Sequence, residues 1–230
     1  MNLYAVINGD WVDSSAYSQK EKQEYLKIVK ILFSEINKIK QSGLINTFEI
    51  TRLDSFQGVT ERPEKSLIIT LLLRSYLRAK LTRKFNPSYE GKIQRPFFKR
   101  VPDIRFAIGV GEAVLKAKFS ESDGAAFTAS GRLLEEMKGK KEKILITSPW
   151  KEVDEEFEVQ FALLDALISR WTFFQSEVIF YKLSGNTEKE IAEILQISQP
   201  AVNFRTQTAH WWVIEKLLER FERVIIKNIS

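Results

Sequence analysis

The chain has 230 residues, of which 44% are hydrophobic and 28% charged, with a formal net charge of +5. This composition is that of an ordinary globular protein with room for one large domain or two small ones. No cysteine is present, which excludes disulfides and thiol nucleophiles and fits a reducing cytoplasm. His210 is the single histidine, too few for a zinc cluster. No apolar run reaches the roughly 18 residues of a membrane span, and the N-terminus lacks signal-peptide features, so we expect a cytoplasmic protein without membrane contact.

Two aspartates follow apolar runs that read as strands. Residues 3–7 are apolar and precede Asn8-Gly9-Asp10, and residues 48–59 alternate around Asp54, which predicts a hairpin with Asp54 at its tip. If both segments are neighbours in one sheet, Asp10 and Asp54 emerge at the same edge. Such a carboxylate pair suits Mg²⁺ or Mn²⁺ carrying nucleotide phosphates. The alternative is that each aspartate only caps a strand end, because aspartate favours turns.

Helix start signals separate these strands. Ser18 and Glu21 have the spacing of a capping box, and Pro63 suits the first turn of a second helix. Residues 82–102 hold three prolines and predict a long basic loop. Its interleaved basic and aromatic side chains could bind phosphates and stack on nucleic-acid bases. The alternative is a solvated loop that a few aromatic rings anchor to the protein.

The remaining pattern sets the fold class. Alternation predicts a strand at residues 104–110, followed by a helix at 124–138 and a last strand at 144–146. This order is the split βαβ plan with an appended unit, and we expect a mixed sheet with helices on one face. The sequence therefore predicts an α+β, ferredoxin-like domain at residues 1–150 and an all-α domain at 151–230.

The all-α part contains a segment, TEKEIAEILQISQPAVNFRTQTA, that resembles a helix-turn-helix over its whole length. Thr187 begins a second capping box, and Ser198 is placed to cap the following helix. Gln196 stands where glycine is frequent, and a left-handed backbone there costs about 1 kcal/mol. Three side chains of the second helix would meet base edges or phosphates: Gln199, Asn203 and Arg205.

The charge of this segment favours an alternative, a helical hairpin used only for packing or dimerisation. From residue 177 onward, basic and acidic side chains are equal in number. Because DNA affinity relies heavily on phosphate neutralisation, a neutral motif binds weakly as a monomer. The last helix repeats apolar residues from Trp211 to Ile225 in a near-heptad seam, which packs within the chain or pairs with a second copy. The DNA-binding hypothesis therefore includes a homodimer.

Four segments, in order along the chain, carry a resemblance to a known family. They are YAVINGDWVDS, FEITRLDSFQGV, DIRFAIGVGE and DGAAFTASGRLLEEMK, and they look like the SatD family, small bacterial proteins with a C-terminal helix-turn-helix. In that family the hairpin usually reads GDEFQG, whereas this chain has Leu53-Asp54-Ser55-Phe-Gln-Gly. The resemblance implies a fold and a DNA-binding context more than an activity.

The same positions are distantly similar to class III nucleotidyl cyclases, which is what we mean by a cyclase-like domain. In those enzymes an aspartate ends the first strand, another lies at a hairpin tip, and a late helix carries an asparagine and an arginine four residues apart. The resemblance implies metal ligation by Asp10 and Asp54 and nucleotide contacts by Thr128 and Arg132. Thr128 replaces the amide here, and Arg132 is equally explained as a solvated residue of an amphipathic helix.

Three hypotheses follow. The first is a regulator that couples a nucleotide- or metal-binding, cyclase-like domain to a DNA-binding helix-turn-helix. The second is a nucleotidyl cyclase or nucleotidyltransferase in which Asp10 and Asp54 hold two metal ions and Arg132 stabilises charge on the transferred phosphoryl group. The third is that both halves are interaction modules only.

Overall fold

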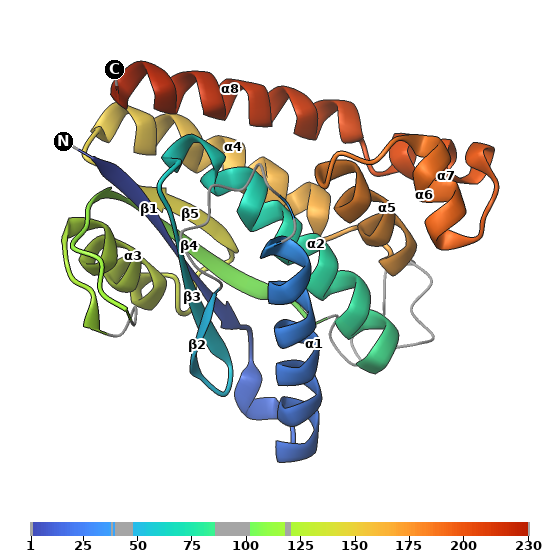
Figure 1. Ribbon diagram of the computed structural model, residues 1–230, viewed down its shortest axis with the longest axis horizontal. Helices are drawn as coiled ribbons and strands as arrows, with labels where there is room; N and C mark the ends of the chain where they lie inside the picture. The colour runs from blue at the N-terminus through green and yellow to red at the C-terminus, as the bar shows by residue number, and fades with distance from the viewer. Residues whose placement is uncertain (1, 38, 40–47, 86–101, 118–120, 230) are drawn as a thin grey trace.

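One mixed sheet organises the first part of the chain (Figure 1). The computed structural model describes residues 2–37, 39, 48–85, 102–117 and 121–229. Within these ranges the sheet order is β2-β3-β1-β4-β5, with antiparallel neighbours except for the parallel pair β4 and β5. The strands are β1 (Leu3–Trp11), β2 (Glu49–Arg52), β3 (Ser55–Thr60), β4 (Ile104–Glu112) and β5 (Ile144–Thr147).

The helices begin largely where the capping signals predict. Ser18 Oγ accepts from the backbone N–H of Glu21 at 3.3 Å, and Glu21 Oε2 accepts from the N–H of Ser18 at 2.9 Å. Most of the predicted basic loop lies outside the described residues, because α2 runs to Phe85 and the description resumes at residue 102. The helices are α1 (Gln19–Asn37), α2 (Ser66–Phe85), α3 (Ala125–Glu136), α4 (Lys151–Ile168), α5 (Phe173–Leu183), α6 (Glu188–Leu195), α7 (Gln199–Thr208) and α8 (Trp211–Ile229).

Helices cover both faces of the sheet, so the expectation of helices on one face is wrong. Ala5 and Ile7 of β1 belong to the core shared with α1 and α2, whereas Val6 packs with Ala126 of α3 on the opposite face. The reason lies in β4. A Cβ atom at Gly109 would lie 2.5 Å from the carbonyl oxygen of Ala126, so glycine at this position lets the α3 backbone lie directly on the strand.

The main apolar core continues past residue 150. Phe157 and Phe161 of α4 and Phe221 of α8 belong to the same buried cluster as Ile7 of β1, and the rings of Phe157 and Phe221 lie 4.9 Å apart. The predicted seam of α8 thus buries Phe221 against α4 within the chain. The division into a first and a second domain stays a prediction.

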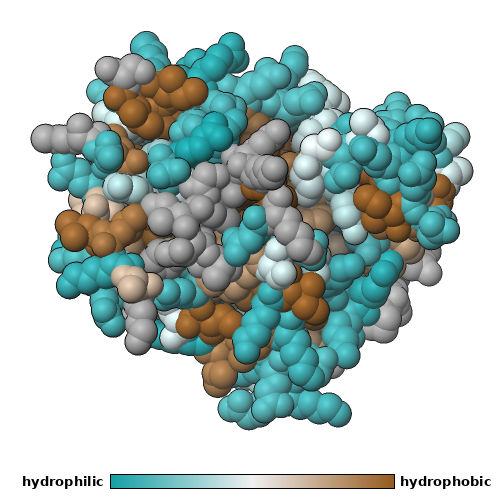
Figure 2. Space-filling view, in the orientation of Figure 1, coloured by the Kyte–Doolittle hydropathy of each residue, from teal (hydrophilic) through white to brown (hydrophobic). Residues whose placement is uncertain are grey.

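The surface carries few large apolar areas on the face that is drawn. Figure 2 shows a largely hydrophilic face with separate apolar patches, including one over the helices α5 to α7. Among the described helices, none combines the length and the apolar character needed to cross a bilayer.

A buried ion-pair network joins the two parts of the chain. Arg74 of α2 is 1% exposed and donates to both carboxylate oxygens of Asp103, at 3.0 and 2.9 Å, and to Asp165 of α4. Asp165 also accepts from the backbone N–H of Lys143 at 2.6 Å, immediately before β5. Burial raises the pKa of Asp103, but the charge of Arg74 and its hydrogen bonds lower it more, so this pKa lies below its ordinary value. The carboxylate is therefore stabilised in its charged form.

Replacement of Arg74 by methionine tests the network. We expect Arg74→Met to reduce the free energy of unfolding by about 3–5 kcal/mol, because the buried Asp165 loses its ion-pair partner and Asp103 keeps only the more distant guanidinium of Arg78, at 3.7 Å. Urea denaturation measures the change. The matched control is Arg220→Met, which removes an ion pair with Glu156 whose arginine side chain is 53% exposed. Equal losses of unfolding free energy in the two variants would show that the buried network stabilises the fold no more than an exposed ion pair does.

Candidate functional site

The backbone brings Asp10 and Asp54 to one edge of the sheet, as the sequence predicts. Asp10 is the second-last residue of β1 and pairs with Ser55, the first residue of β3. The turn between β2 and β3 consists of Leu53 and Asp54, and the N–H of Trp11 donates to the carbonyl oxygen of Asp54 at 2.8 Å. The two aspartates therefore hold neighbouring backbone positions, which we call the aspartate edge.

Each of these carboxylates has one side-chain partner among the described residues. Arg105 lies opposite Asp10 in the register of β1 and β4, and its Nη1 atom is 3.3 Å from Asp10 Oδ2. The hydroxyl of Ser14 donates to Asp54 Oδ2. In the described part of the chain, the Oδ1 atom of each aspartate accepts no hydrogen bond. One oxygen from each carboxylate thus remains available to a cation.

Electrostatics at the edge work against the charged forms of the Asp10 carboxyl and the Tyr25 hydroxyl. Burial raises the pKa of Asp10 above its ordinary value, the positive charge of Arg105 opposes this, and the negative charge of Asp54 raises it further. Burial also raises the pKa of the Tyr25 hydroxyl, and the charges of Asp10 and Asp54 add to that effect. This hydroxyl is buried and has no hydrogen-bond partner among the described residues. A cation would relieve the repulsion between the carboxylates.

The residues present fit a cation that keeps most of its water. Within the described ranges, no group of three or more histidine, cysteine, aspartate and glutamate side chains could hold a metal ion. Mg²⁺ commonly takes one or two carboxylates and completes its shell with water and substrate phosphates. Asp10 and Asp54 match that donor set, whereas they do not match a closed structural site.

Thr128 and Arg132 lie on α3 and are exposed. Neither side chain forms a hydrogen bond or ion pair with Asp10 or Asp54 within the part of the chain that the structure describes. The four predicted residues are therefore not joined by polar contacts among the described residues. Sequence reasoning missed Arg105, whose signal is a single basic residue inside an otherwise apolar strand.

The helices α6 and α7 lie on either side of a short turn at residues 196–198. Gln196 between them has a left-handed backbone, with φ of 54°, and Ser198 caps α7 by accepting from the N–H of Ala201. Gln199 and Asn203 are exposed, and Asn203 Nδ2 donates to Glu188 at 3.4 Å. This pair presents two amides to solvent.

Arg205 lies on a different side of α7. It is two residues, about 200° around the helix, from Asn203. Its guanidinium lies 4.5 Å from the ring centre of Phe174 in α5, and burial lowers the pKa of Arg205. The structure thus separates the predicted DNA contacts into an exposed amide pair and a stacked arginine.

Comparison with known proteins gives distant likenesses among solved structures only. No protein-family model and no curated protein matches this chain. Among solved structures, the catalytic core of a rhodopsin-guanylyl cyclase with converted specificity, in complex with ATPalphaS, matches with a TM-score of 0.39 and 15% sequence identity. The match covers 64% of this chain and 77% of that chain. A likeness of this degree does not transfer an activity.

Removal of the Arg105 charge is expected to raise the pKa of Asp10 further. Arg105 is the strongest lowering influence on this carboxylate, so Arg105→Gln leaves the effect of burial opposed only by the weaker influence of Lys138. Carboxyl-carbon NMR titration of Asp10 measures the shift. Lys138→Gln is the control, because Lys138 lowers the same pKa less than Arg105 does. An unchanged Asp10 titration in Arg105→Gln would contradict the pairing.

Proposed function

We propose that the aspartate edge binds a divalent cation, Mg²⁺ or Mn²⁺, together with the phosphates of a nucleotide. The observation that carries this proposal is the hydrogen bond from Trp11 N–H to the Asp54 carbonyl, which fixes two carboxylates at neighbouring positions. Each carboxylate has an oxygen that accepts no hydrogen bond from the described residues. Like charges in such proximity favour a bound cation.

The roles of the residues follow from their chemistry. Asp10 and Asp54 would hold the cation, which when bound neutralises phosphate charge. Arg105 adds a guanidinium beside Asp10, and guanidinium groups donate readily to phosphate oxygens. In the nucleotidyl cyclase or nucleotidyltransferase alternative, Arg132 would stabilise the transferred phosphoryl group. Arg132 is exposed and forms no hydrogen bond or ion pair with either aspartate among the described residues, which favours nucleotide binding over turnover by a single chain.

Mn²⁺ titration followed by electron paramagnetic resonance tests the cation site. Asp10→Asn and Asp54→Asn are each expected to weaken Mn²⁺ binding by about tenfold or more, since even outer-shell changes reach that size at metal sites. Asp13→Asn is the matched control, because Asp13 is an exposed aspartate next to the edge and asparagine tolerates its left-handed backbone.

The outcome of that titration also separates the alternatives. Equal weakening in Asp13→Asn and Asp54→Asn would reject a specific site. Mass spectrometry of a ribonucleoside triphosphate mixture, incubated with the protein and Mn²⁺, then distinguishes binding from turnover. A new nucleotide species formed by the unmodified protein and absent with Asp54→Asn would establish an enzyme.

DNA binding by α6 and α7 of a homodimer is a second proposed function. It is favoured by the exposure of Gln199 and Asn203, four residues apart and thus neighbours on the surface of α7. Amide side chains pair with adenine in the major groove. Because the motif is neutral, two copies would be needed for useful affinity. In this proposal the cyclase-like part would regulate the DNA-binding part.

Paired substitutions test this function through the retention of short duplexes at increasing salt. Gln199→Ala combined with Asn203→Ala is expected to weaken specific binding by about tenfold or more, since each good amide contact contributes about 1–3 kcal/mol of discrimination. Arg205→Ala should have the smaller effect, because its guanidinium already stacks on Phe174. Retention that is insensitive to salt, or equal in all variants, would reject DNA binding.

A further inference from the structure

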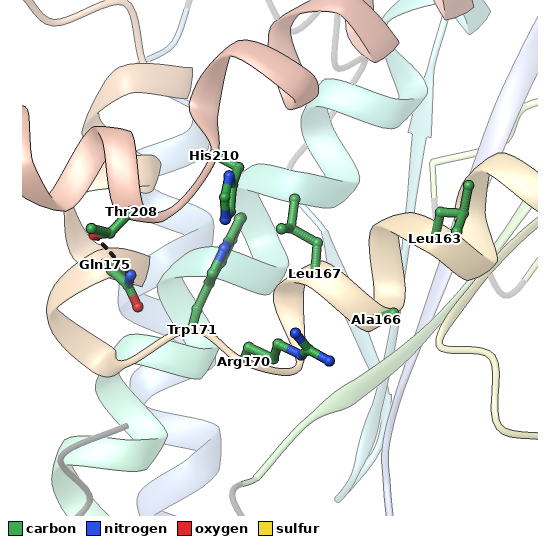
Figure 3. A pocket seen from close by; sticks show the side chains of 8 residues that line it. All are labelled: Leu163, Ala166, Leu167, Arg170, Trp171, Gln175, Thr208 and His210. Carbon is green, nitrogen blue, oxygen red and sulfur yellow. Dashed lines mark hydrogen bonds between the residues drawn. The ribbon is translucent and has the colours of Figure 1, made fainter. Parts of the chain in front are cut away.

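An apolar cavity lies away from the aspartate edge, where the turn between α4 and α5 meets the turn between α7 and α8 (Figure 3). Its volume is about 350 Å³, within the range of sites that hold small organic molecules. Leu163, Ala166 and Leu167 of α4 line it, together with Trp171 of the turn that follows α4. Trp171 is 2% exposed, so the accessible apolar surface of the cavity comes mainly from the α4 side chains, of which Leu163 is 68% exposed.

Hydrogen bonds between the two turns hold the cavity open. The indole N–H of Trp171 donates to the carbonyl oxygen of Ala209 at 3.2 Å. Gln175 Nε2 donates to the hydroxyl of Thr208 at 3.0 Å, as the dashed line in Figure 3 shows. Because these bonds connect α4 and α5 to the end of α7, the walls are preformed and a ligand would lose little free energy in ordering them.

The rim of the cavity carries positive charge without a counter-charge. The side chain of Arg170 is exposed and forms no ion pair or hydrogen bond with the residues that the structure describes. No acidic side chain occurs among the described lining residues. The imidazole of His210 lies beside the Trp171 ring. An anionic group at this rim would therefore meet an unpaired guanidinium and no carboxylate.

The backbone at His210 is strained. Its φ is 57°, in the left-handed region, which costs a residue other than glycine roughly 1–2 kcal/mol. His210 directly follows Ala209, the C-cap of α7, and a left-handed residue at this position commonly ends a helix. The indication of a ligand therefore comes from the apolar lining and from the unpaired guanidinium of Arg170.

We infer that this cavity binds a small organic anion with a flat apolar body, of the chemical class of aromatic carboxylates. The ring of the ligand packs against Leu163 and Leu167, and its carboxylate accepts from the guanidinium of Arg170. This inference is independent of the proposed functions, because none of the cavity residues belongs to the aspartate edge or to the exposed amide pair of α7.

Isothermal titration calorimetry with 1-naphthoate tests the site, with 1-naphthalenemethanol as the neutral probe of similar shape. The unmodified protein is expected to bind the carboxylate about fivefold more tightly, the upper range for a partly exposed ion pair. Arg170→Gln should remove this preference and leave the affinity for the alcohol unchanged. Equal affinities in the unmodified protein, or no binding of either probe at millimolar concentration, would overturn the inference.

A substitution that fills the cavity locates the binding. Ala166 is an exposed residue of α4 that lines the cavity, and Ala166→Phe is expected to abolish binding of both probes. Ala162→Phe is the control, because Ala162 is exposed on the same helix and does not line the cavity. Unchanged melting temperatures confirm that both variants fold. Binding that survives Ala166→Phe would place the probes elsewhere and overturn the assignment.

Discussion

The buried guanidinium of Arg74 is the interaction on which the geometry of the aspartate edge depends. It holds both oxygens of Asp103, the residue directly before β4. The carbonyl oxygen of Asp103 in turn accepts from the N–H of Val12, directly after β1, at 3.0 Å. One buried charge therefore fixes the start of β4 against the end of β1, where Asp10 and Arg105 face each other. This core contact therefore sets the geometry of the aspartate edge.

The main value of such a network is specificity, because desolvation offsets much of the attraction in a buried ion pair. The register of β1 shows what a loss of this specificity would change. Asp10 shares a sheet face with Val6, whereas Trp11 points into the aromatic cluster with Tyr25, at 4.5 Å between ring centres. Because side chains alternate along a strand, a slip of one residue would place the carboxylate in that cluster. Contacts that pin the strand ends therefore protect the site.

Local chemistry in the sequence predicted the elements and the positions of the two aspartates. A short apolar run predicted β1 and alternation predicted the hairpin, and the capping boxes at Ser18 and Thr187 formed as predicted. Even the left-handed turn at Gln196 followed from the motif. These features depend on neighbours within a few residues, so a single sequence contains their causes.

The features that sequence could not predict depend on contacts between distant residues. The place of α3 follows from backbone contact at Gly109, and a lone glycine in a strand does not reveal which helix will approach it. The pairing of Arg105 with Asp10 requires the β1–β4 register, and the orientation of Arg205 requires the position of Phe174. The sequence thus predicted the two aspartates of the candidate site, whereas it did not predict the side chains that pair with them.

The contrast between Asp10 and Asp103 separates a functional environment from a structural one. The pKa of Asp103 is lowered in the folded chain, so its charged form contributes stability above its unfolded pKa, and this contribution is lost as the pH falls through the folded value. The pKa of Asp10 is raised, so its charged form costs stability at neutral pH, and the cost disappears as the pH falls through the folded value. Perturbations of the second kind cluster at functional sites. A bound cation would remove the free-energy cost of charging Asp10, whereas Arg74 already removes that cost at Asp103. The aspartate edge therefore keeps a carboxylate charge that a ligand can neutralise.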